Sequence, residues 1–153
     1  MNSNIKLLAL DFDGVLTDNT VMVDENGKES VVCNRSDSLG IELLKKQGID
    51  VVVISKEKNK VVKARCKKMN INCINGIDDK INVLKNEIKK RGLKPEDVCF
   101  VGNDINDIEC IKYVKLGVAV NNAYPEVKKA SKKVTQKNGG DGAVREVVDM
   151  ILD

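Results

Sequence analysis

Short apolar runs, each ending in polar residues and each followed by a helix-length segment, constrain the fold of this chain more than any other feature. They lack the strict alternation of a half-exposed strand, so they predict strands that are buried on both faces. Buried strands that alternate with helices predict a parallel sheet with helices on both sides. The runs are Ile5–Leu10, Ile49–Ile54, Val98–Val101 and Leu116–Val120.

The segments between these runs carry helix patterns and end signals. Ser36 or Asp37 is expected to cap the first helix, and Gly48 to stop it. Asn26-Gly27 lies between two β-branched runs, at 20–23 and 29–33, and predicts a hairpin. Helices are expected at about 36–46, 58–69, 78–91, 106–113, 125–130 and 144–152, with a short strand at 71–74. A chain of 153 residues with this pattern predicts one α/β domain, residues 1–153.

Composition excludes several function classes. The chain has no histidine, which rules out Ser-His-Asp and Cys-His nucleophile systems and His-ligated metals. Two Phe, two Tyr and no Trp are too few for a nucleic-acid stacking platform. The five cysteines, an odd number without C-x-x-C spacing, indicate a reducing cytoplasm. The first apolar run is too short for a signal peptide or a membrane span, so we expect no membrane partner.

Two acidic residues, Asp11 and Asp13, directly follow the first predicted strand. Acids so close together repel each other unless a cation neutralises them. Oxygen ligands without histidine or thiolate suit Mg²⁺. Gly14 would let backbone N–H groups approach a bound anion. A solvated acidic turn is the alternative explanation of the pair taken alone.

Polar features also follow other predicted strands. Ser55 could donate to a phosphate oxygen, and Lys80 could neutralise a phosphate and a nucleophile. The GNDIND segment, residues 102–107, could complete a metal site with acid and amide oxygens. Each feature alone also fits an ordinary loop or helix cap. Because the carboxyl ends of parallel strands share one edge, we expect them to meet there and to supply what phosphoryl transfer requires.

These residues carry a family resemblance. DFDGV, Ser55, Lys80 and GNDIND resemble the four motifs of the haloacid dehalogenase superfamily. The order of LALDFDGVLTD, CNRSDSLGI, VVVISKEKN, GIDDK, GNDINDIEC, NAYPEV and GGDGAVREV is similar to that of capless phosphatases of 3-deoxy-2-keto sugar acids. That group includes octulosonate 8-phosphate phosphatases and nononate or acylneuraminate relatives associated with acylneuraminate cytidylyltransferases. The resemblance implies a Rossmann-like three-layer α/β/α fold with a β-hairpin flap after the first strand.

The resemblance also implies residue roles. Asp11 would be the nucleophile that forms an aspartyl-phosphate, and Asp13 the general acid and then base. Ser55 and Lys80 would hold the phosphate. The expected Mg²⁺ ligands are Asp11, Asp13, Asn103 and Asp104, with Asp107 behind them. The expected substrate-binding residues are Thr17, Arg35, Asp37, Lys56, Glu57 and Arg145, of which the two arginines are candidates for a sugar carboxylate.

Capless members of the family assemble as tetramers in which hairpins and C-terminal tails close neighbouring active sites. A homotetramer is therefore expected, with the glycine-rich segment Asn138–Gly142 as a flexible tail. A cytidylyltransferase is a further possible partner by the same resemblance.

Two departures from the family pattern affect the prediction. Asn103 stands where the family often has Asp, which predicts weaker Mg²⁺ binding. Ser55-Lys56-Glu57, with Lys67 or Lys68 about three helical turns on, resembles the nononate branch, so a nine-carbon acid 9-phosphate is the favoured substrate. The alternatives are 3-deoxy-D-manno-octulosonate 8-phosphate, or a weakly active oligomerisation module for a cytidylyltransferase. A response-regulator receiver is disfavoured, because its phosphorylated Asp follows a middle strand.

Overall fold

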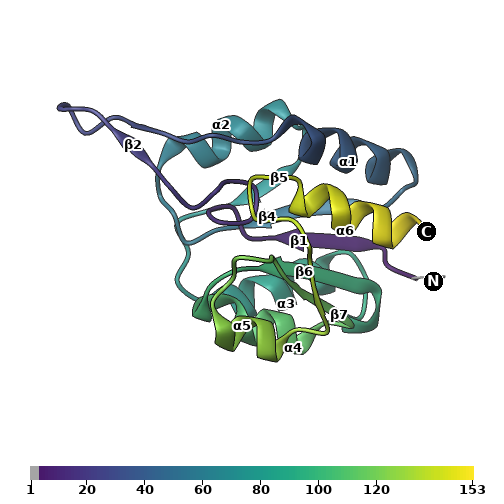
Figure 1. Ribbon diagram of the computed structural model, residues 1–153. Helices are drawn as coiled ribbons and strands as arrows, with labels where there is room; N and C mark the ends of the chain where they lie inside the picture. Colours follow the sequence, from purple (N-terminus) through teal and green to yellow (C-terminus); the bar gives the residue numbers. More distant parts are fainter. Residues whose placement is uncertain (1–3) are drawn as a thin grey trace.

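A six-stranded parallel sheet forms the centre of the molecule in the computed structural model, which describes residues 4–153 (Figure 1). The strand order is β5-β4-β1-β6-β7-β8, and every pairing is parallel. A separate antiparallel hairpin pairs β2 with β3. The strands are β1 Leu7–Leu10, β2 Met22–Val23, β3 Glu29–Ser30, β4 Asp50–Ile54, β5 Asn72–Ile74, β6 Val98–Gly102, β7 Leu116–Ala119 and β8 Lys133–Val134.

Helices cover both faces of the sheet and confirm the predicted three-layer α/β/α arrangement (Figure 1). Helices α1, α2 and α6 lie on one face, and α3, α4 and α5 on the other. The helices are α1 Arg35–Lys46, α2 Lys60–Lys68, α3 Lys80–Lys90, α4 Ile108–Tyr113, α5 Pro125–Ala130 and α6 Ala143–Leu152, with 3₁₀ turns η1 Pro95–Asp97 and η2 Ile105–Asp107. Within residues 4–153, none of these helices has the length and apolarity that crossing a bilayer requires.

The central strands are the most apolar, as their composition predicts. All four residues of β1 and all five of β6 are buried, because helices cover both faces of these strands. The chain winds from β1 toward β4 and β5 on one side, and from β6 toward β7 on the other. The strand order therefore reverses between β1 and β6. Ligands of open α/β sheets bind at such a switch point, outside the carboxyl ends of the strands.

The hairpin forms where Asn26-Gly27 predicts it, with Gly27 in the left-handed region at φ 78°. It projects from the body of the molecule, and its strands are shorter than the two runs suggest (Figure 1). Three successive apolar side chains, Val21, Met22 and Val23, are 50, 75 and 56% exposed on it.

Two local predictions need correction. Asn34, rather than Ser36 or Asp37, caps α1, with its side-chain oxygen accepting from the backbone N–H of Ser36. Strand β8 was not predicted at all, because two exposed residues carry too little pattern to indicate a strand.

Candidate active site

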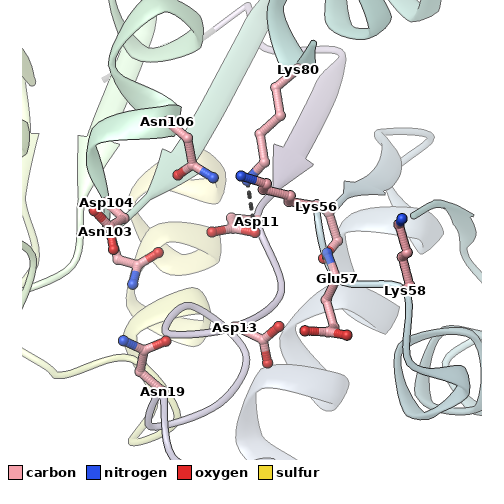
Figure 2. Close-up of a pocket in the computed structure, with 11 residues that line it drawn as sticks. Asp11, Asp13, Asn19, Lys56, Glu57, Lys58, Lys80, Asn103, Asp104 and Asn106 are labelled. Atoms are coloured by element: carbon pink, nitrogen blue, oxygen red, sulfur yellow. Dashed lines mark hydrogen bonds and ion pairs between the residues drawn. The ribbon is translucent and has the colours of Figure 1, made fainter. Parts of the chain in front are cut away.

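A cavity of about 400 Å³ opens at the carboxyl ends of β1, β4 and β6, at the switch point of the sheet (Figure 2). The predicted strand-end residues meet there as the parallel topology requires. All the residues that line it are of polar types: acids, lysines, amides and one serine. The lining residues are Asp11, Asp13, Asn19, Ser55, Lys56, Glu57, Lys58, Lys80, Asn103, Asp104 and Asn106.

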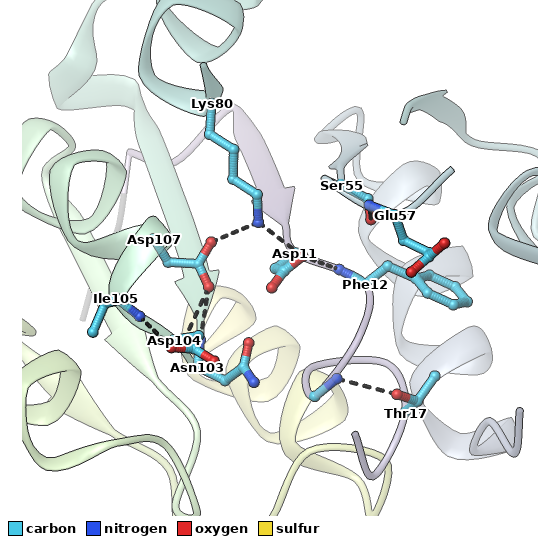
Figure 3. Close-up of polar contacts among 11 residues, drawn as sticks. Asp11, Phe12, Thr17, Ser55, Glu57, Lys80, Asn103, Asp104, Ile105 and Asp107 are labelled. Atoms are coloured by element: carbon cyan, nitrogen blue, oxygen red, sulfur yellow. Dashed lines mark hydrogen bonds and ion pairs between the residues drawn. The ribbon is translucent and has the colours of Figure 1, made fainter. Parts of the chain in front are cut away.

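A buried ion network occupies the floor of this cavity (Figure 3). Nζ of Lys80 lies 2.9 Å from Oδ1 of Asp11 and 2.8 Å from Oδ1 of Asp107. The Lys80 side chain is 2% exposed, and that of Asp107 is fully buried. Lys80 is the first residue of α3, and Asp79 caps that helix, so the helix start fixes where the lysine enters the site.

Burial shapes the acid–base properties of the network. Burial, followed by repulsion from Asp107, raises the pKa of Asp11 to about 8, although Lys80 opposes the rise. Burial works against the charge on Lys80, yet the two carboxylates outweigh it and raise the lysine pKa. One cation therefore does not fully offset two buried acids. A further cation at the open side of Asp11 would favour the nucleophilic carboxylate.

Asn103 marks where such a cation fits. Its side-chain oxygen faces Oδ2 of Asp11 and the main-chain oxygen of Asp13, with no donor between them. Exchanging the amide atoms would instead place the nitrogen 3.0 and 3.1 Å from those two oxygens. In that orientation the amide donates to both oxygens, whereas with its oxygen turned inward it would join them as a ligand of the type that Mg²⁺ prefers.

Within residues 4–153, no three Cys, Asp or Glu side chains gather as metal ligands. An ion bound here would draw on the Asn103 amide and the main-chain carbonyl of Asp13 beside Asp11. Asp104 lines the cavity, but its Oδ1 accepts from the N–H of Ile105 and caps η2. Asp107 accepts from the N–H groups of Asn103 and Asp104 at 3.0 and 3.3 Å, so it holds this loop from behind.

Asp13 and Ser55 border the space next to Asp11. Burial, then the charges of Glu57 and Glu29, raise the pKa of Asp13, which suits a group that donates and later accepts a proton. The Ser55 hydroxyl accepts from the N–H of Glu57 at 3.2 Å, so its own proton is available to the cavity. Lys56 and Glu57 also line the cavity.

Four predicted substrate-binding residues do not line this cavity. Thr17 is buried, and its hydroxyl accepts from the N–H groups of Gly14 and Asn19, so it shapes the loop. Arg35 is exposed at the start of α1. Asp37 is buried, and its carboxylate accepts from the N–H of Arg145 in α6. The Arg145 side chain pairs with Asp149 on the surface of α6. Within one chain, neither arginine lines this cavity, and their role toward a sugar carboxylate stays a prediction.

Three lining residues, Asn19, Lys58 and Asn106, were missed from the sequence. Asn19 adopts φ 69°, a conformation that Asn tolerates better than most residues. A polar residue in a loop carries no signal for its direction, which only the folded loop supplies. The prediction of a flexible tail at Asn138–Gly142 is wrong within this chain, because Gly139 is buried against the main chain of Gly14.

Comparison with known proteins agrees with this geometry. Residues 45–147 match the haloacid dehalogenase-like hydrolase family. The chain is 37% identical to the 3-deoxy-D-manno-octulosonate 8-phosphate phosphatase KdsC of Escherichia coli K12, over 97% of this chain and 80% of that protein. The chain belongs to the haloacid dehalogenase-like hydrolases. It is thus an enzyme of the phosphatase type.

Solved structures of relatives share the fold of this haloacid dehalogenase-like hydrolase closely. The octulosonate 8-phosphate phosphatase of Moraxella catarrhalis, in complex with magnesium, phosphate and KDO, is 34% identical with a TM-score of 0.95. It matches over 99% of this chain and 87% of its own. The cobalt-bound Haemophilus influenzae enzyme is 32% identical, with a TM-score of 0.94 over 98% and 88%. A divalent cation is accordingly the cofactor of this enzyme type, in agreement with the oxygens around Asn103.

Proposed function

We propose that this chain is a Mg²⁺-dependent phosphatase of a 3-deoxy-2-keto sugar acid phosphate. The observation that carries the proposal is the meeting of Asp11, Lys80 and the Asn103 amide in one cavity, at the switch point of the sheet. A carboxylate, a buried cation and converging oxygens match the needs of phosphoryl transfer. The cavity volume of about 400 Å³ suits a small metabolite.

The proposed chemistry assigns one task to each group. A carboxylate oxygen of Asp11 attacks phosphorus and the bond from phosphorus to the sugar oxygen breaks, while Lys80 pairs with the carboxylate and Ser55 donates to the phosphate. Asp13 protonates the leaving alkoxide and then accepts a proton from the water that opens the aspartyl-phosphate. Bound Mg²⁺, held by Asp11, Asp13 and Asn103, supplies charge neutralisation of the phosphate oxygens.

Among sugar acids, we favour 3-deoxy-D-manno-octulosonate 8-phosphate. The relatives that cover nearly the whole chain carry that activity in their names. The Ser55-Lys56-Glu57 segment favours the nine-carbon acid instead, and no relative described above supports that choice. The predicted homotetramer, cytoplasmic location, single domain over 1–153 and cytidylyltransferase partner stay predictions.

Phosphate release from the two sugar acid phosphates, compared at equal Mg²⁺, tests the proposal. We expect kcat/KM for the octulosonate ester to exceed that for the nononate ester by about tenfold or more, since a site built for one polar substrate discriminates strongly. The opposite ratio would reverse the substrate assignment. Absence of release from both, and from generic phosphate esters, would refute the phosphatase itself. Light scattering of the purified chain would test the tetramer separately.

A further inference from the structure

The glycine-rich turn Asn138–Gly142 packs directly behind the loop that carries the nucleophile. A methyl group on Gly139 would lie 1.8 Å from the main-chain oxygen of Gly14, and one on Gly140 would lie 2.5 Å from the N–H nitrogen of Asp18. The N–H of Gly140 also donates to the main-chain oxygen of Val15 at 3.2 Å. The turn thus follows the backbone of the Asp13–Asp18 loop without any side chain between the two.

The turn is itself held by the segment after β7. The N–H of Gly139 donates to Oδ1 of Asn122 at 3.1 Å. Two residues further on, the N–H of Tyr124 donates to the main-chain oxygen of Asn103 at 3.1 Å. One short segment, 121–124, therefore contacts both the turn behind Gly14 and the loop that presents the Asn103 amide.

These contacts support the two loops whose oxygens could bind a divalent cation. The Asn103 amide lies against Gly14, where a Cβ would come within 2.0 Å of its nitrogen, and faces Asp11 and the Asp13 carbonyl. Mg²⁺ tolerates little departure from octahedral geometry at about 2.0–2.1 Å. A main-chain carbonyl has no rotamer with which to correct an error, so its accuracy depends on what supports the loop.

We propose that Gly139 and Asn122 are positioning residues for the cation-binding oxygens of Asp13 and Asn103. The inference rests on the proposed function only in that the cation serves the phosphatase reaction. A glycine is required at position 139 because a Cβ there would collide with the main chain of Gly14. Its backbone angles do not require glycine, since they lie outside the left-handed region. Asn122 is required for its oxygen, which orients the N–H of Gly139.

Gly139→Ala tests the steric part of the proposal, with Gly117→Ala as a matched control. In Gly117→Ala the new methyl would lie 2.2 Å from the main-chain oxygen of Ile111, a similar crowding away from the cavity. Mg²⁺ affinity is measured by calorimetry without substrate, alongside thermal unfolding and kcat. We expect Gly139→Ala to weaken Mg²⁺ binding by about ten- to a hundredfold, the cost typical of disturbed support around a metal site. Gly117→Ala should lose stability yet keep its Mg²⁺ affinity.

Asn122→Asp and Asn122→Leu decide the case if Gly139→Ala does not fold. Asp keeps the oxygen that accepts from Gly139 and should keep Mg²⁺ affinity within about threefold, whereas Leu should weaken it by about tenfold. The inference would be overturned if Gly139→Ala bound Mg²⁺ as tightly as the wild type, or if Asn122→Asp and Asn122→Leu changed the Mg²⁺ affinity equally. It would also be overturned if the wild type did not bind Mg²⁺. A wild type that binds Mg²⁺ but releases no phosphate would refute the proposed function alone.

Discussion

The two ends of helix α3 each place a cation between two carboxylates, but the two networks differ in their exposure to water. At the start of the helix, Lys80 lies between Asp11 and Asp107, and its side chain is 2% exposed. At the other end, Arg91, the C-cap residue, pairs with Asp50 and Glu87, and the side chains of Arg91, Glu87 and Asp50 are 13, 9 and 50% exposed. The same charge pattern therefore occurs once almost fully buried and once with one of its two carboxylates half exposed to water.

The difference shows why only one of the two networks is suited to catalysis. In the Arg91 network, water reaches the half-exposed Asp50, and Lys90 also pairs with Glu87 at 3.6 Å, so neither carboxylate depends on Arg91 alone. The Lys80 network is hardly screened, and burial raises the pKa of Asp11 to about 8, which leaves that acid in need of further positive charge. Reactive groups are found where burial leaves charges imperfectly balanced next to an open cavity.

Asp11→Asn should give the largest effect, because it removes the proposed nucleophile while keeping its shape. We expect phosphate release to fall by at least about a thousandfold. The melting temperature should not fall, since the change also removes a buried charge beside Asp107. Phosphate assays and thermal unfolding measure the two quantities. Activity within tenfold of the wild type would rule out Asp11 as the nucleophile.

Replacing each cation of α3 by methionine tests the comparison itself. Lys80→Met leaves Asp11 and Asp107 buried without a partner, so we expect a loss of about 3–5 kcal/mol in the free energy of unfolding. Arg91→Met, the matched control, leaves the nearly buried Glu87 with Lys90 and the half-exposed Asp50 with water, so it should cost less, about 1–2 kcal/mol, and leave activity unchanged. Urea unfolding at neutral pH measures both values. Equal costs would mean that the two ends of α3 do not differ in dielectric environment as their burial indicates.

Asn103→Asp adds a third acid next to the Lys80 network at the start of α3. It should increase the difference between this network and that of Arg91. Another negative ligand favours a divalent ion, so we expect Mg²⁺ binding to tighten by about tenfold, or about 1.4 kcal/mol. Without Mg²⁺ the variant should be less stable, because the new charge faces Oδ2 of Asp11. Calorimetry measures the change in Mg²⁺ affinity, and thermal unfolding with and without Mg²⁺ measures the change in stability. Weaker binding would show that Asn103 does not contact the cation.

Much of the fold and the centre of the site follow from the sequence for the same physical reason. Apolar runs identify buried strands, and parallel strands bring their carboxyl ends to one edge, so Asp11, Ser55, Lys80 and Asn103 are predictable as neighbours. Their convergence requires only the strand order, which local patterns and crossover rules nearly determine.

What the sequence does not predict depends on contacts between distant segments. Asp37 reads as a cap for its own helix or as a substrate ligand, yet it binds the N–H of Arg145, 108 residues away. The turn at Gly139 reads as a flexible tail, yet it packs against Gly14. Glycine and aspartate suit several local roles equally well, and only tertiary packing selects among them.

Asp37 is another buried carboxylate and supplies the smallest expected effect, because no cation pairs with it directly. Burial raises its pKa to about 6, against the N–H of Arg145 and the charge of Arg65 on α2, while Asp141 adds to the rise. Its Oδ2 has no hydrogen-bond partner among residues 4–153. Cys33 and Arg65 are the other titratable groups facing this region.

The raised pKa of Asp37 fixes the sign of the pH dependence. Well below pH 4 the group is protonated in both the folded and unfolded states and costs nothing. As pH rises toward 6, the unfolded chain releases the proton first, so the wild type loses stability over that interval.

The free energy of unfolding of Asp37→Asn should therefore rise relative to that of the wild type between pH 4 and 6. We expect a gain of about 1 kcal/mol, because the amide still buries a polar group. Asp149→Asn, which removes an exposed acid from α6, is the control and should run parallel to the wild type. If the free energy of unfolding of Asp37→Asn also ran parallel to that of the wild type against pH, Asp37 would carry its charge in the folded protein without loss of stability.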